Sequence, residues 1–175
     1  MIQAIAKAEQ QLIQLCKTRG ILLSIIRPTL IWGAGRDKNV SRIAHWAATH
    51  RIFPSYRGLS GLRQPVHVDD LALLVLKLLV ARPKGIQVLA AAGGEILKYR
   101  EMVKRIYAAL EKQVIYLPLP AWMVDFAVKY PTDMQTIFVM LQRTRQDMVF
   151  ERDALLDELA WQPRGFEPEK AMLGV

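Results

Sequence analysis

Two short apolar runs of strand length constrain the fold of this chain more than any other feature of its sequence. Residues 21–26 and 86–91 are rich in Ile, Leu, Val and Ala and carry no charge. Such runs fit strands that are buried on both faces, which is the habit of parallel sheets. Pro28 is expected to end the first strand because proline has no N–H group for the ladder. Gly93 and Gly94 close the second.

Helical patterns alternate with these strands, and this alternation favours an α/β fold. Residues 2–18 read as an amphipathic helix that stops at Gly20. Asn39 is a plausible N-cap for a helix through about residue 49, and Asp69 or Asp70 is expected to cap a strongly apolar helix over 71–81. Further predicted segments are a loop with room for a short strand over 53–65, an extended stretch at 66–68, a helix over 97–110 and a third strand over 114–117.

Trp46, Trp122 and Trp161 lie at helical or turn positions, where we expect tryptophans to pack in the core.

The last third of the chain is expected to be mainly helical. The predicted elements are a helix that starts at Pro118 and Pro120 and runs to Ala127, a second helix over 132–142, a short helix over 153–159 and an extended tail.

The positive charge of the chain is concentrated in its first 65 residues. The chain holds 24 Lys and Arg against 16 Asp and Glu, for a net charge of +8. Residues 1–65 hold ten of these cations and two acids, whereas residues 66–175 hold fourteen of each sign. Such a local excess indicates either an anionic partner or a solvated basic surface. Nucleic acid is the weaker choice of partner, because no aromatic side chains interleave with the cations.

Neither a membrane segment nor a metal site is expected. The first residues lack the basic and long apolar regions of a signal peptide, and the best apolar runs fall short of the roughly 20 residues that span a bilayer. The single cysteine, Cys16, fits a reducing compartment, and the three histidines have no zinc spacing. We therefore expect a soluble, cytoplasmic protein.

Five sequence blocks carry a resemblance to a known family. They are Glu9, residues 25–33, 63–71, 88–95 and 159–163. In this order and spacing they resemble the C-terminal half of an extended short-chain dehydrogenase/reductase, the NAD(P)-dependent epimerase/dehydratase family, which acts largely on nucleotide sugars. The sequence contains only two convincing buried strands, whereas a doubly wound sheet normally has more. This shortage agrees with a resemblance to only half of such a protein.

The resemblance implies a partial Rossmann-like parallel sheet with a small C-terminal α/β substrate-binding region. Residues 1–92 would be the C-terminal part of the Rossmann-like domain and would include a substrate loop over 33–65. Residues 93–175 would form a mainly helical substrate-binding region.

The resemblance also implies site residues. Pro28, Thr29 and Leu30 follow the first strand and would line the nicotinamide of NAD or NADP; for Pro28, simple termination of the strand is the alternative. Asn39 matches a nucleotide-contacting Asn at a helix N-terminus, where anions bind, although a plain N-cap also fits. Arg63 matches an arginine that grips the substrate diphosphate with its guanidinium fork.

The chain departs from the family at the residues that do the chemistry. The Gly-rich dinucleotide fingerprint is absent. The catalytic Tyr-x-x-x-Lys falls on Met1 and Ile5 in one register and on Gln3 and Lys7 in the other, so no catalytic residue is expected. Leu30 also stands where sugar-nucleotide members commonly have Asn.

Three functional hypotheses follow. In the first, the chain is the substrate-side half of an epimerase/dehydratase-like protein that acts on a nucleotide sugar or related substrate and is inactive alone. In the second, it is a non-catalytic assembly or sensor subunit that kept the scaffold. The third is nucleic-acid binding. Because a truncated sheet leaves unpaired strand edges, self-association is also expected.

Overall fold

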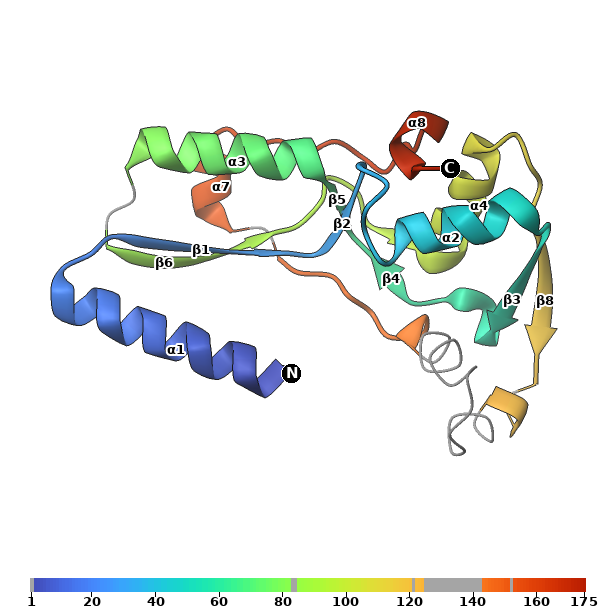
Figure 1. Cartoon of the computed structure of the whole chain (residues 1–175), viewed down its shortest axis with the longest axis horizontal. Helices are drawn as coiled ribbons and strands as arrows, with labels where there is room; N and C mark the ends of the chain where they lie inside the picture. The colour runs from blue at the N-terminus through green and yellow to red at the C-terminus, as the bar shows by residue number, and fades with distance from the viewer. Residues whose placement is uncertain (1, 83–84, 121, 125–142, 152) are drawn as a thin grey trace.

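The computed structural model describes residues 2–82, 85–120, 122–124, 143–151 and 153–175. Helices and strands alternate along the first two thirds of the chain (Figure 1). In chain order the elements are α1 (Ile2–Arg19), β1 (Leu23–Pro28), β2 (Leu30–Trp32), α2 (Val40–Thr49), β3 (Ile52–Tyr56), the short 3-10 helix η1 (Arg57–Leu59), β4 (Leu62–Arg63), β5 (Pro65–His67), α3 (Val68–Ala81), β6 (Ile86–Ala91), β7 (Leu97–Lys98), α4 (Tyr99–Ala109), β8 (Ile115–Leu119), α7 (Ala154–Glu158) and α8 (Lys170–Leu173).

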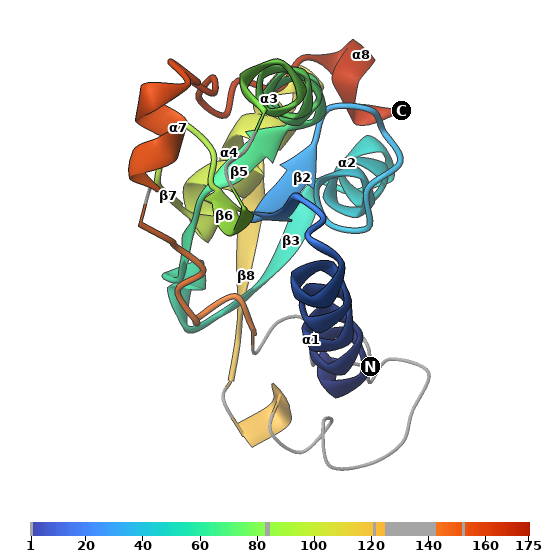
Figure 2. The same ribbon diagram turned by 90° about the vertical axis from the view of Figure 1, so that its left-hand side faces the viewer.

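The strands pair mainly in parallel, which confirms the predicted α/β class. β1 pairs with β6 from Leu23↔Ile86 to Pro28↔Ala91. β2 pairs in parallel with β5, and β3 with β8, whereas β4 and β7 are antiparallel. Figures 1 and 2 show α3 on one face of the β1–β6 pair and α1 on the other.

The two predicted core strands are correct in position but not in burial. β1 begins two residues later than expected and includes Pro28, which the sequence had placed beyond its end. Residues 23–26 are half-buried, Pro28 is exposed, and Val88 of β6 keeps 37% of its surface. Among the described residues, β1 is hydrogen-bonded only to β6. The expectation of burial on both faces is therefore wrong for this chain, because among the described residues no further strand pairs with β1 or β6 and their edges stay open.

Besides a small cluster of Tyr56 and Val124, two large hydrophobic clusters hold the described residues together. The larger lies between α2 and α4 and includes Trp32, Phe53, Tyr107 and Phe166. The smaller packs α3 and β6 against Trp161 and Leu156 of the C-terminal region. Its Trp161 is fully buried, and its indole N–H donates to the carbonyl oxygen of Asp70 at 2.8 Å.

Both predicted helix caps are corrected by the structure. Asn39 occupies the N-cap position of α2, but its side chain makes no capping hydrogen bond. Asp37 serves instead, accepting from the backbone N–H of Asn39 at 2.8 Å and of Ser41 at 3.2 Å. Asp37 was not predicted because its carboxylate reaches the helix from two residues before the cap.

The N-terminus of α3 differs in the same way. His67 is the N-cap, and its Nδ1 accepts from the backbone N–H of Asp69 at 3.2 Å. The carboxylate of Asp70 is drawn away by Arg164, whose guanidinium lies 2.9 Å from it and whose backbone N–H also donates to it. The Asp70 carboxylate therefore pairs with Arg164, a residue distant in sequence, and does not cap α3. The His67 ring also packs edge-on against Trp32, at 4.7 Å between ring centroids.

The short strand for which the sequence left room within residues 53–65 is confirmed as β3, which its pairing with β8 stabilises. Several other expectations are wrong. Pro118 lies inside β8 rather than at a helix start. The tail includes α8. Trp46 and Trp122 are 40% and 72% exposed, so only Trp161 of the three tryptophans packs in the core.

The remaining helical predictions are confirmed or fall outside the described residues. The helix over 97–110 is α4, and the short helix over 153–159 is α7, where Asp153 caps by accepting from the N–H of Leu155. Of the helix predicted to reach Ala127, residues 122–124 are described as helical. The helix over 132–142 lies outside the described residues. No described helix is long and apolar enough to span a membrane.

Candidate ligand-binding site

The carboxyl end of β1 is held firmly against two other segments. The backbone N–H of Thr29 donates to the carbonyl oxygen of Ala91 at 3.3 Å, and the Thr29 hydroxyl donates to the carbonyl oxygen of Gln64. Leu30 pairs with Pro65 at the start of the β2–β5 ladder. Residues 28–30 thus cross from one pair of strands to the next. In α/β folds, ligands bind beyond this end of the strands.

Close backbone packing keeps this crossing rigid. A Cβ added at Gly93 would lie 1.7 Å from the carbonyl oxygen of Pro65, far inside contact distance. The amide side chain of Gln64 donates to the carbonyl oxygen of Gly93 at 3.1 Å. The turn that sequence reasoning assigned to Gly93 is therefore also a tight backbone contact, and this contact fixes the position of β5 beside residues 91–93.

Asn39 stands exposed at the start of α2, but the free N–H groups there are already engaged. Besides its bonds to backbone N–H groups, Asp37 accepts from the hydroxyl of Ser41 at 2.5 Å. A carboxylate therefore occupies the place where the helix end would attract an anion. A phosphate at Asn39 would have to displace Asp37 or lie beside it.

Arg63 is almost fully buried, with 3% of its surface exposed. Its guanidinium donates to the carbonyl oxygens of Leu62, Gln146 and Arg143 at 2.6–2.8 Å. It also lies over the ring of Tyr99, 5.2 Å from the centroid. Burial lowers the pKa of Arg63 from its ordinary value, and its charge is balanced by carbonyl dipoles and the aromatic ring. This arrangement ties β4 to residues 143–146.

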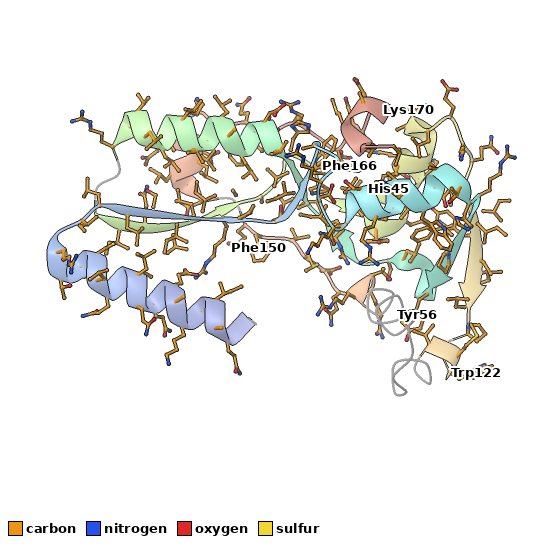
Figure 3. The ribbon with its side chains drawn as sticks, in the orientation of Figure 1. His45, Tyr56, Trp122, Phe150, Phe166 and Lys170 are labelled. Atoms are coloured by element: carbon orange, nitrogen blue, oxygen red, sulfur yellow. The ribbon has the colours of Figure 1, made fainter. Side chains whose placement is uncertain are left out.

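A large pocket opens beside these residues, between α2 and the β3–β8 pair. Its volume is about 860 Å³, which is within the range of small-molecule sites. Figure 3 labels His45 of α2, which lines it, and Tyr56 at the end of β3. The lining residues are Gly35, Asp37, Ser41, Arg42, Ile43, His45, Trp46, Thr49, Ile52, Phe53, Pro54, Tyr99, Leu117, Leu119, Met123 and Thr144.

None of the five predicted site residues lines this pocket. Pro28, Thr29 and Leu30 lie together at the strand crossing, whereas Asn39 and Arg63 each lie next to residues that do line the pocket. Arg63 contacts Tyr99, which lines the pocket, and Asn39 directly precedes α2, which supplies several of the lining residues.

Sequence reasoning missed the residues of α2 that face the pocket. Ser41, Arg42, His45, Trp46 and Thr49 all line it, and their spacing places them on one side of a helix. That spacing was present in the sequence. It gave no signal because the residues mix polar and apolar types and so do not form an apolar stripe.

Burial perturbs the tyrosine beside Arg63. Tyr99 is 8% exposed, and removal of its phenol from water raises its pKa to about 12, although Arg63 and Arg42 oppose this shift. The pKa values of Tyr107 and Tyr116 are likewise raised to about 12, mainly by burial. These phenols remain protonated at neutral pH. Within the described residues, no cluster of His, Cys, Asp and Glu could hold a metal ion.

Comparisons with known proteins agree with this architecture. No family model matches the chain. It is 27% identical over 117 residues to a UDP-glucose 4-epimerase of Vibrio cholerae, a match that covers 67% of this chain and 36% of that protein. The structure of RMD from Pseudomonas aeruginosa, complexed with NADPH, superimposes with a TM-score of 0.69 at 16% identity, over 95% of this chain and 52% of that one. A UDP-glucose 4-epimerase of Thermus thermophilus, in complex with NAD, gives 0.65 at 18% identity, over 95% and 50%.

These matches define a Rossmann-like α/β protein with parallel strands. Through the Vibrio enzyme the chain has a distant sequence similarity to the NAD-dependent epimerase/dehydratase family, the extended short-chain dehydrogenases/reductases, and the two solved structures share its fold. It spans about a third of the length of the Vibrio enzyme and about half of the two solved chains.

Proposed function

We propose that this chain is the substrate-side half of an NAD(P)-dependent epimerase/dehydratase-like protein that acts on a nucleotide sugar or a related substrate. One observation carries the proposal. The parallel strands β1 and β6 end side by side at Pro28 and Ala91, and α/β folds bind their ligands beyond this end of their strands. The fold of the chain also matches about half of the length of two proteins that were solved with NADPH and with NAD.

In this proposal, Pro28, Thr29 and Leu30 line the nicotinamide of NAD or NADP. The hydrogen bonds of Thr29 to Ala91 and Gln64 support such a role, because they hold the backbone of this segment in one position. A rigid backbone wall suits the flat nicotinamide ring, which must be oriented precisely for hydride transfer.

Asn39 and Arg63 would hold the diphosphate of the substrate. The guanidinium fork of Arg63 suits two phosphate oxygens. To reach them, it must exchange its hydrogen bonds with the carbonyl oxygens of Arg143 and Gln146 for bonds to the phosphate. Binding by Arg63 is therefore coupled to movement of residues 143–146.

Alone, the chain should bind the dinucleotide weakly and turn nothing over. The positions where the family carries its Tyr-x-x-x-Lys pair hold no such pair in either register. Burial also raises the pKa of Tyr99, Tyr107 and Tyr116, whereas a catalytic phenol needs a lowered value.

Calorimetric titration of NADH and NADPH into the isolated chain tests this proposal. Dissociation constants in the millimolar range are expected, and a Thr29→Val variant should weaken even this binding because its hydroxyl can no longer fix the segment to Gln64. Micromolar binding by the chain alone would overturn the assignment as a half-site.

A second candidate is a non-catalytic assembly or sensor subunit that kept the scaffold. The raised tyrosine pKa values and the missing Tyr/Lys pair favour it. The reading frame upstream of the Met1 codon discriminates the two. An in-frame stretch with a Gly-rich turn and a Tyr-x-x-x-Lys would support the enzyme half, and a stop codon would support the subunit.

We also propose that the chain self-associates. The outward face of α3 is apolar, with Leu73, Leu76, Leu79 and Val80 between 48% and 84% exposed. A helix that is apolar all round is normally buried. Sedimentation at tens of micromolar should therefore give a species heavier than the 19.9 kDa chain, and a clean monomer would contradict self-association.

A further inference from the structure

The pocket between α2 and the β3–β8 pair is lined mainly by apolar side chains. Aromatic and aliphatic groups from three elements meet there: Trp46 from α2, Phe53 from β3, and Leu117 and Leu119 from β8. Met123 adds a flexible thioether, which adapts to ligands of different shape. Leu117 is 51% exposed and Trp46 40% exposed, so this apolar surface is open to a ligand.

Most polar side chains in the pocket are already hydrogen-bonded within the protein. The Ser41 hydroxyl donates to Asp37, and the carboxylate of Asp37 in turn accepts from the N-terminal N–H groups of α2. The indole N–H of Trp46 donates to the carbonyl oxygen of Ile52 at 2.8 Å. His45 Nδ1 lies 2.7 Å from the carbonyl oxygen of Ser41. Few groups are left to replace the water around a ligand that carries many hydroxyls or phosphates.

Arg42 is the exception among the polar residues that line the pocket. Its side chain is exposed and, within the described part of the chain, makes no hydrogen bond or ion pair. It lies close enough to Tyr99 to act on that phenol electrostatically. Among the lining residues that the structure describes, the pocket thus combines a large apolar surface with one available cation, Arg42.

We propose that this pocket binds an apolar ligand with a single anionic group, its hydrocarbon part against Trp46 and Leu117 and its anion at Arg42. A carboxylate with a hydrocarbon chain has this chemistry. None of the residues proposed to hold a dinucleotide and a diphosphate, namely Pro28 to Leu30, Asn39 and Arg63, is itself a lining residue of this pocket. The inference therefore stands or fails independently of the proposed function.

Calorimetry with octanoate, decanoate and dodecanoate tests the apolar part of the proposal, below their micellar concentrations. Each methylene buried should tighten binding about fourfold, hence roughly 15-fold from one acid to the next. Leu117→Glu should abolish the binding. Leu12→Glu is the matched control, since Leu12 is 44% exposed on α1 and lies outside the pocket, and it should bind dodecanoate like the parent chain.

Dodecanol compared with dodecanoate tests the anionic part. The parent chain should prefer the carboxylate by about twofold to fivefold, as expected for a partly solvated ion pair. Arg42→Gln should remove this preference and keep the dependence on chain length. Arg19→Gln, at the end of α1, should retain both.

Three results would overturn the proposal. They are affinities that do not depend on chain length, equal losses in the Leu117→Glu and Leu12→Glu variants, and binding of UDP in the pocket with no binding of dodecanoate. Association with phosphatidylglycerol vesicles, without binding of free dodecanoate, would likewise show that the apolar surface meets a membrane and not a small ligand.

Discussion

Replacing Arg63 with lysine tests whether this buried guanidinium holds the site together. Arg63 donates to three carbonyl oxygens, those of Leu62, Arg143 and Gln146. A backbone hydrogen bond joins the same two segments, since the N–H of Met148 donates to the carbonyl oxygen of Leu62 at 3.0 Å. Lysine keeps the charge but presents a single ammonium group on a flexible stem. It therefore cannot reproduce a fork that spans carbonyls on two segments.

The size of the loss follows from the number of hydrogen bonds. A hydrogen bond to a charged group contributes about 1.5–3 kcal/mol, and lysine can keep one of the three. The free energy of unfolding should therefore fall by about 3–6 kcal/mol. For a chain of this length, even the lower figure corresponds to a drop in Tm of roughly 6–12 °C.

Urea unfolding followed by circular dichroism measures this loss. Arg100→Lys is the matched control, because Arg100 also lies over a tyrosine ring, that of Tyr116 at 3.9 Å, but its side chain is exposed. The control should lose no more than about 1 kcal/mol. If Arg63→Lys unfolds at the same urea concentration as the parent, the buried carbonyl contacts contribute nothing and the reasoning is refuted.

Three other variants probe the packing and the charges around the site. Gly93→Ala should destabilise the chain by about 2–3 kcal/mol in urea unfolding, because its Cβ would meet the carbonyl oxygen of Pro65. Hydrogen bonds from Arg105 lower the pKa of Glu95 below 4.5. The stability that these bonds confer is therefore present above that pH and is lost as the pH falls below it. The free energy of unfolding in urea should differ less between pH 7 and pH 3 for Glu95→Gln than for the parent chain. Burial, reinforced by the charge of Arg164, lowers the pKa of His67 below 6.5. The unfolded chain therefore binds a proton at this histidine more readily than the folded chain, and the free energy of unfolding should fall from pH 7 to pH 5. The His67→Gln variant should lose this pH dependence of stability.

Each of these variants has a clear contrary outcome. Gly165→Ala is the control for Gly93, since its Cβ would lie 3.2 Å from the carboxylate of Glu95 and would meet no backbone atom, and an equal loss in both would remove the steric explanation. An unchanged acid sensitivity in Glu95→Gln would show that other carboxylates govern unfolding at low pH. A parent chain whose stability is flat between pH 7 and pH 5 would show that His67 is protonated equally well in both states.

The strands and main helices were predictable because their signals are local. The runs at 21–26 and 86–91 have strand length and composition, and the structure pairs them in parallel as β1 and β6. The apolar spacing over 97–110 predicted α4, with Met102, Val103 and Ile106 fully buried. Each of these patterns depends on residues within one element.

The cap of α3 and the pairing of β3 were not predictable because partners distant in sequence decide them. Asp70 leaves the start of α3 for Arg164, ninety-four residues away along the chain. β3 exists through its pairing with β8, although Pro54 lies within it and argues against a strand. No local propensity contains this information.

The candidate site was only partly predictable for the same reason. The segment 28–30 could be located because it directly follows a strand. The pocket could not, since it forms where α2 meets β3 and β8, and the pairing of β3 with β8 was not foreseen. The burial of Arg63 was also missed, because the residues that accept its hydrogen bonds lie about eighty positions further along the chain.

An NMR titration of the isolated, isotope-labelled chain with NADH tests the central claim most directly, because it reports both where the dinucleotide binds and how tightly. The account predicts weak binding in the millimolar range, with the largest shifts at the amides of Thr29 and Leu30 and at those of Ala91 and Ala92 beside them. Shifts that leave these amides unchanged, or saturation at micromolar NADH, would contradict the assignment of this chain as the substrate-side half of a dinucleotide-binding protein.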